Sequence, residues 1–319
     1  MRKAALETVH DLARSDPRVV FVGSDLTAGT LKEMKQELPD RFYMEGVSEA
    51  HIIGMSAGLA LSGKVVYVNT IATFLTRRCL EQLVDDLCLH SVKVRLIANG
   101  GGLVYAPLGP THLAIEDIAL LRAIPNMAVV VPCDAQEMRR LITQTVDWPT
   151  PIYFRVAKGG EPIVSRADLP CTIGKAIRLR EGEDLLLITT GVTLHEALRA
   201  AETLDRRGVA TGILHVHTIK PLDGADILKA AAGVPAIITV EEHTICGGLG
   251  SAVAEILAEA DFAGAKRFRR CGIPDVFPDK YGSQSDHMAQ FGIDAAGIVR
   301  VAEELVGRPV CSTVARRGL

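Results

Sequence analysis

Cysteine pairs and aromatic side chains are both scarce in this sequence of 319 residues. Seven cysteines are scattered along it without a CxxC pair. An odd number at irregular spacing fits reduced thiols better than a disulfide framework or a zinc module. Aromatic residues make up only 4% of the chain, so a single aromatic such as Phe74 is by default a core residue. We therefore expect a reduced, cytoplasmic protein.

Long apolar runs and an excess of one charge are also missing. The net charge is -3 and the lysines and arginines are dispersed, so no basic face for nucleic acid is expected. Apolar runs such as Leu185 to Ile188 have the length of a strand and fall far short of a membrane span. Met1-Arg2-Lys3 leads into an amphipathic helix pattern and not into a signal peptide. Neither nucleic acid nor a membrane is therefore an expected partner.

Strand-length apolar runs alternate with helical patterns along the whole chain. Such alternation is typical of parallel sheets covered on both faces. The expected strands are 19–23, 65–68, 94–98, 129–132, 152–155, 185–189, 210–216, 236–240 and 268–271. A linker is expected at 157–169, which holds Gly159-Gly160 and Pro162. The sequence thus predicts an α/β fold with two doubly wound domains, residues 1–165 and 166–319.

Glu49 stands at the start of an expected helix that is rich in small residues. Gly46 and Val47 carry the backbone through a tight segment, and Ser48 is a plausible N-cap. The helix can pack closely because it contains Gly54, Ser56, Ala57, Gly58 and Ala60. A carboxylate in this place either interacts with the helix dipole or serves as an acid beside a ligand. Glu49 by itself leaves both interpretations open.

Several motifs occur in an order that resembles transketolase-type thiamine diphosphate enzymes. The first half contains Gly46-Val47-Ser48-Glu49, Thr73-Phe74-Leu75 and Gly109-Pro110-Thr111-His112. The second half contains Val240-Glu241-Glu242-His243, Gly247-Gly248-Leu249-Gly250-Ser251, Gly272-Ile273-Pro274-Asp275 and Tyr281-Gly282. The resemblance covers nearly the whole chain. It implies a pyrimidine-binding domain followed by a transketolase C-terminal domain.

The resemblance implies four contacts to thiamine diphosphate. Glu49 would hydrogen-bond the aminopyrimidine and favour the imino tautomer that deprotonates the thiazolium C2 atom. Phe74 would stack on the same ring. Asp25, just after the first strand, would help to hold the cofactor. Arg77, three residues after the phenylalanine, is similar to an arginine of deoxyxylulose-phosphate synthases.

Three further residues are implied for the substrate. His112 resembles the residue that reaches the reacting carbon. Arg155 ends a strand, where its forked cation can bind a phosphate bidentately. Arg2 matches a family position through its spacing before Asp25. Transketolases usually carry Asp and His where this chain has Leu108 and Gly100, which argues for an atypical ketose.

The Gly-Asp-Gly motif that holds the diphosphate and Mg²⁺ in this family does not occur in the sequence. The resemblance therefore implies the C-terminal subunit of a split transketolase, whose N-terminal partner holds Mg²⁺ in an α2β2 assembly. The enzyme would transfer a two-carbon ketol unit from a phosphorylated ketose, atypical or branched, to an aldose. Three alternatives stay open: the β subunit of a 2-oxoacid dehydrogenase, a deoxyxylulose-phosphate-synthase-like enzyme, and a non-catalytic homologue used for assembly.

Two short motifs rich in histidine and glutamate superficially resemble metal ligands. These are Glu241-Glu242-His243 and His215-Val216-His217. Neither has a third ligand at a sensible spacing, so we expect structural use and no metal site. The loop 247–250 lacks both GxGxxG spacing and a P-loop lysine, so it is interpreted as a tight turn from strand to helix.

Overall fold

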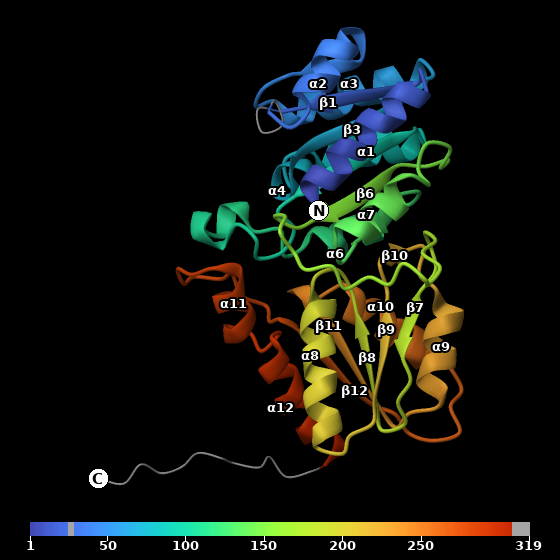
Figure 1. Cartoon of the computed structure of the whole chain (residues 1–319), viewed down its shortest axis with the longest axis vertical. Helices are drawn as coiled ribbons and strands as arrows, with labels where there is room; N and C mark the ends of the chain where they lie inside the picture. The colour runs from blue at the N-terminus through green and yellow to red at the C-terminus, as the bar shows by residue number, and fades with distance from the viewer. Residues whose placement is uncertain (25–28, 308–319) are drawn as a thin grey trace.

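The molecule consists of two α/β units, each a sheet with its covering helices, which lie one above the other in Figure 1 and are called the first and second layer below. The computed structural model describes residues 1–24 and 29–307. One sheet has seven strands in the order β10-β5-β6-β4-β3-β1-β2, and the other has five in the order β12-β11-β8-β9-β7. Strand pairs are parallel except β10 with β5 and β7 with β9. The predicted α/β fold with two doubly wound sheets is confirmed.

Every expected strand is present, with ends that shift by a few residues. The first sheet consists of β1 (Val19–Gly23), β2 (Phe42–Met44), β3 (Val65–Ile71), β4 (Val94–Asn99), β5 (Ala128–Val130), β6 (Ile152–Val156) and β10 (Thr218–Lys220). The second consists of β7 (Ile177–Arg180), β8 (Leu185–Thr189), β9 (Thr211–His215), β11 (Ala236–Thr244) and β12 (Arg267–Ile273). Sequence reasoning missed β2, β7 and β10, which all lie at sheet edges. Such short edge strands need no continuous apolar run, because they are not covered like central strands.

Helices cover both faces of each sheet (Figure 1). In the first half these are α1 (Arg2–Ser15), α2 (Lys32–Glu37), α3 (Glu49–Leu61), α4 (Ala72–Thr76), α5 (Leu80–Gln82), α6 (Asp117–Ala123) and α7 (Ala135–Ile142). In the second they are α8 (Thr193–Arg206), α9 (Gly224–Ala232), α10 (Leu249–Ala258), α11 (Gln284–Gln290) and α12 (Ala295–Val306). Short 3₁₀ turns are η1 (Pro39–Arg41), η3 (Ala106–Leu108) and η4 (Pro110–His112), and η2 (Leu83–Leu89) is π-helical. Within residues 1–24 and 29–307, none of the helices has the length and apolar character needed to cross a bilayer.

The first sheet separates two apolar cores. Along β1, Val20 and Val22 belong to one core, whereas Val19 and Phe21 belong to the other. Successive side chains of a strand point to opposite faces, so an uninterrupted apolar strand is buried on both sides. The core that contains Val20 continues into the second sheet through Leu186 and other β8 residues, which ties the two layers together.

The edge strand β10 links the two halves of the chain, because it pairs with a strand of the other half. It lies in sequence within the second expected domain, yet Thr218 pairs antiparallel with Val130 of β5 in the first sheet. Lys220 of the same strand donates hydrogen bonds to the carbonyls of Arg122 and Ile124. The two halves are thus interlocked at this edge, and the domain boundary at residue 165 stays a prediction.

Candidate cofactor and substrate site

Glu49 is the first residue of α3 and is almost completely buried, with 5% of its surface exposed. Its Oε2 atom lies 3.1 Å from Nη1 of Arg78. Ser48 occupies the N-cap position, but its hydroxyl donates to the carbonyl of Glu45 and not to the helix. Ser48 is thus the N-cap residue by position, as expected, but its side chain makes no capping hydrogen bond to α3.

Arg78 connects the acid to two other expected site residues. Its guanidinium carbon lies 3.6 Å from the centroid of the Phe74 ring. The Phe74 and His112 rings meet edge to face, with centroids 5.3 Å apart and planes at 64°. Glu49, Arg78, Phe74 and His112 thus form one continuous line. Sequence reasoning missed Arg78, and only its place directly after Arg77 could have drawn attention to it.

The Arg77 side chain points away from that of Arg78 and toward the turn that carries His112. Its Nε atom lies 2.6 Å from Oε1 of Glu116, and its Nη2 atom donates to the carbonyls of Pro110 and Leu113. These contacts fasten the turn that carries His112. A role of Arg77 in binding the cofactor stays a prediction, and the geometry gives it a bracing role.

The segment 100–116 that carries His112 lies on the second layer. The amide of Leu103 donates to the Glu242 carboxylate at 2.8 Å, and the amide of Thr244 donates to the Ile115 carbonyl at 2.8 Å. Side chains of the segment, among them Leu103, belong to the same core as α8 and α12. In Figure 1 it projects from the body on the side where α11 lies. The loop is therefore anchored at both of its ends by the C-terminal half.

Arg155 does not face an open phosphate site. Its side chain is 5% exposed, and its Nε atom donates to Oδ2 of Asp117 at 2.9 Å. Its Nη2 atom donates to the carbonyls of Ala114 and Glu242 at 2.7 and 2.8 Å. These donors join β6 to the C-terminal end of the His112 loop, to α6 and to β11, and binding of a substrate phosphate by Arg155 stays a prediction.

Replacing Asp117 with alanine is expected to lower the free energy of unfolding by about 3–5 kcal/mol. The change leaves the Arg155 cation buried without its counterion, and it also removes the acceptor of the Tyr153 hydroxyl. Urea unfolding of the chain measures the loss. Asp168, in an exposed pair with Arg166, is the matched control, and its replacement is expected to cost about 1 kcal/mol or less. Equal losses for the two variants would contradict the structural role of Asp117.

The glycine at position 100 is required by its surroundings. Its φ angle is +75°, and a Cβ atom there would lie 2.0 Å from the Tyr105 ring. A histidine at this position would need both a different backbone and a different place for Tyr105. Leu108, the other departure from the usual pattern, is 56% exposed at the end of η3. Gly100 is thus required by the loop conformation, whereas the Leu108 side chain is exposed.

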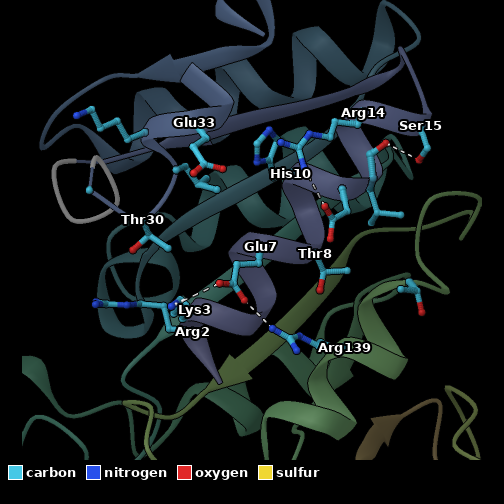
Figure 2. A pocket seen from close by; sticks show the side chains of 16 residues that line it. Arg2, Lys3, Glu7, Thr8, His10, Arg14, Ser15, Thr30, Glu33 and Arg139 are labelled. Carbon is cyan, nitrogen blue, oxygen red and sulfur yellow. Dashed lines mark hydrogen bonds and ion pairs between the residues drawn. The ribbon is translucent and has the colours of Figure 1, made fainter. Parts of the chain in front are cut away.

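Arg2 is not brought into the line around Glu49. Asp25 lies outside the described residues. Arg2 begins α1 and lines a polar groove of about 1310 Å³ together with Thr30 and Arg139. Figure 2 shows its side chain extending away from the Glu7–Arg139 ion pair. Both assignments stay predictions.

Each half of the chain matches the model of a known protein family. Residues 1–160 match the model described as transketolase, pyrimidine binding domain, and residues 174–298 match transketolase, C-terminal domain. The chain belongs to the transketolase family. The resemblance seen in the motifs is confirmed, and thiamine diphosphate is the cofactor that this family implies.

Similar proteins of the transketolase family have nearly the same length as this chain. It is 39% identical over 307 residues to an apulose-4-phosphate transketolase subunit of Phocaeicola vulgatus, covering 96% of this chain and 97% of that protein. It is 33% identical over 310 residues to a 6-deoxy-6-sulfo-D-fructose transketolase subunit of Clostridium sp., covering 97% and 95%. A solved structure titled "Split gene transketolase, inactive beta4 tetramer" superposes with a TM-score of 0.87 at 30% identity, covering 96% and 98%.

These matches favour a transketolase subunit over the alternatives. A 1-deoxy-D-xylulose-5-phosphate synthase is 36% identical, but the chain spans only 44% of that protein. The two transketolase subunits named above are instead matched from end to end.

Proposed function

We propose that this chain is the pyrimidine-binding subunit of a split, thiamine diphosphate-dependent transketolase. In this proposal it transfers a two-carbon ketol unit from a phosphorylated ketose to an aldose. The observation that carries the proposal is the buried Glu49 carboxylate in line with Phe74 and His112. Support comes from relatives named as separate transketolase subunits. The free thiols of the described cysteines agree with a cytoplasmic enzyme.

The described residues fit the pyrimidine half of the cofactor. A site for an aminopyrimidine needs an aromatic face against the ring and a carboxylate at the edge of the ring. In this structure Arg78 contacts both such groups, Phe74 and Glu49. The guanidinium is planar like the ring and half exposed, so it can move aside. Thr73, next to Phe74, has a buried hydroxyl with no hydrogen-bond partner among the described residues. That hydroxyl is a further polar group available to a ligand.

The diphosphate half belongs to the proposed partner. The chain has no Gly-Asp-Gly motif, so an N-terminal subunit is proposed to hold the diphosphate and Mg²⁺, in an α2β2 assembly. When bound, the cofactor would supply the carbon nucleophile that ketol transfer requires. Glu49 would hold a proton at the pyrimidine nitrogen. His112, held in place through Arg77 and the anchored loop, orients the ketose near Phe74.

Arg78 and the aminopyrimidine compete for the same two groups in this proposal. Arg78→Leu is therefore expected to tighten binding of Mg²⁺-thiamine diphosphate to the assembled enzyme by about 2- to 5-fold, the equivalent of an exposed cation–π contact of about 0.5–1 kcal/mol. Calorimetric titration measures the change, with Arg166→Leu on the exposed surface as the control. Weaker binding would show that Arg78 contacts the cofactor directly.

The donor is proposed to be a phosphorylated ketose that differs from xylulose 5-phosphate at the carbon next to the carbonyl. Leu108 offers no acceptor to a hydroxyl there, and an unpaired hydroxyl costs about 1–3 kcal/mol. The relatives named for apulose 4-phosphate and 6-deoxy-6-sulfo-D-fructose support a donor of this atypical kind.

Ketol transfer by the reconstituted pair of subunits tests the proposal. A panel of phosphorylated ketoses, linear and branched, is assayed with an aldose acceptor. The kcat/KM for xylulose 5-phosphate is expected to lie below about 10⁵ M⁻¹s⁻¹, with a higher value for another ketose of the panel. A higher value for xylulose 5-phosphate would mean that Leu108 and Gly100 are tolerated in an ordinary transketolase. No transfer from any ketose, with oxidation of a 2-oxoacid instead, would overturn the function itself.

A further inference from the structure

A buried cluster of metal-ligating side chains lies where the two layers meet. Cys133 and Glu137 flank the start of α7, and His215 ends β9. One ligand atom from each of these three residues lies within 4.8 Å of the other two. Cys171 and His217 form a second such group with the same Glu137. The third ligand that the sequence did not reveal therefore comes from distant parts of the chain.

Both histidines are oriented in the way that metal ligands usually are. His215 has its Nδ1 atom 3.1 Å from the Thr189 hydroxyl, and its Nε2 atom lies 3.1 Å from Oε2 of Glu137. His217 has its Nδ1 atom 2.8 Å from the Thr218 hydroxyl, and its Nε2 atom faces the Cys171 sulfur at 3.9 Å. In each ring a threonine holds one nitrogen, which directs the other toward the cluster.

Glu137 has one carboxylate oxygen that is not satisfied. Oε2 accepts a hydrogen bond from the Cys133 amide at 2.7 Å. Oε1 is buried and has no hydrogen-bond partner among the residues that the structure describes. The whole residue is 1% exposed. Buried polar atoms almost always have a partner, so an oxygen of this kind needs an explanation, and a bound cation supplies one.

We propose that Cys133, Glu137 and His215 bind a zinc ion, with His217 of the Cys171–His217 pair as the fourth ligand. A thiolate and a carboxylate balance the double charge of zinc, and with His217 as the fourth ligand the buried site is neutral. Sulfur and imidazole ligands favour zinc over Mg²⁺, which prefers oxygen ligands. The site is therefore distinct from the Mg²⁺ site proposed for the partner subunit.

A site with four protein ligands has no open position for a substrate, so the zinc is structural. Its ligands come from the first half of the chain and from the second half. The ion would fasten the junction beside the β5–β10 pair.

Cobalt and zinc binding test this proposal without any assay of catalysis. The chain is unfolded in the presence of a chelator to remove bound metal, and it is then refolded with either Zn²⁺ or Co²⁺. We expect about one zinc ion per chain, a tetrahedral cobalt spectrum with a sulfur-to-cobalt charge-transfer band, and a higher melting temperature than without metal. Cys133→Ser should remove that band, whereas Cys246→Ser, which changes an exposed thiol outside the cluster, should keep it.

A second variant keeps the test decisive if Cys133→Ser fails to fold. Glu137→Gln retains the shape of the side chain and should weaken zinc binding by at least about 10-fold. The proposal is overturned if the wild-type chain refolds with zinc well below one ion per chain. It is also overturned if cobalt bound to it shows no sulfur band, or if Cys133→Ser keeps the band.

Discussion

Replacing Glu49 with glutamine is expected to lower kcat of the assembled enzyme by about 10²-fold or more. Glutamine has the same size but cannot share a proton with the pyrimidine nitrogen. The fold is expected to tolerate the substitution, since the residue begins α3 and its ion-pair partner Arg78 is half exposed. Steady-state ketol transfer at saturating thiamine diphosphate gives the comparison.

A nearby carboxylate provides the control for this variant. Glu45 lies four residues earlier, in the bend before α3, and its carboxylate lies 3.9 Å from the exposed His51 ring. Glu45→Gln should retain full activity, and both variants should have the wild-type circular dichroism spectrum. Activity of Glu49→Gln within a few-fold of wild type would mean that Glu49 serves only the start of the helix.

Without its partner, the chain is expected to show no ketol transfer and to bind thiamine diphosphate weakly. The charged half of the cofactor has no Gly-Asp-Gly motif to bind to, and Phe74 and Glu49 provide only the pyrimidine contacts. Calorimetry with Mg²⁺ and cofactor, before and after addition of the N-terminal subunit, measures the difference. Ketol transfer by the purified chain alone would refute the expectation.

Strand-length apolar runs allowed the sheets to be predicted, because they record burial on both faces. The same signal is missing in the short edge strands β2, β7 and β10, which were not found. In the site, Glu49, Phe74 and His112 were expected and lie together. These three could be found because each belongs to a short local motif.

Contacts between distant segments account for what the sequence did not reveal. Arg77 and Arg78 are adjacent in the chain, and only the turn after α4 decides that Arg78 reaches Glu49. Arg155 was correctly placed at the end of a strand, but its partner Asp117 comes from a separate helix. No local spacing encodes pairings of this kind.

Strand β10, which belongs in sequence to the second half of the chain, covers an edge of the first sheet that would otherwise be open. Without β10, the backbone groups of β5 would be available to pair with another molecule, which is the usual origin of edge-to-edge aggregation. The two halves are consequently not interchangeable modules, although each has its own sheet. We therefore expect the whole chain to fold as one unit. Truncation at the linker is expected to yield a fragment that aggregates through the uncovered edge of β5.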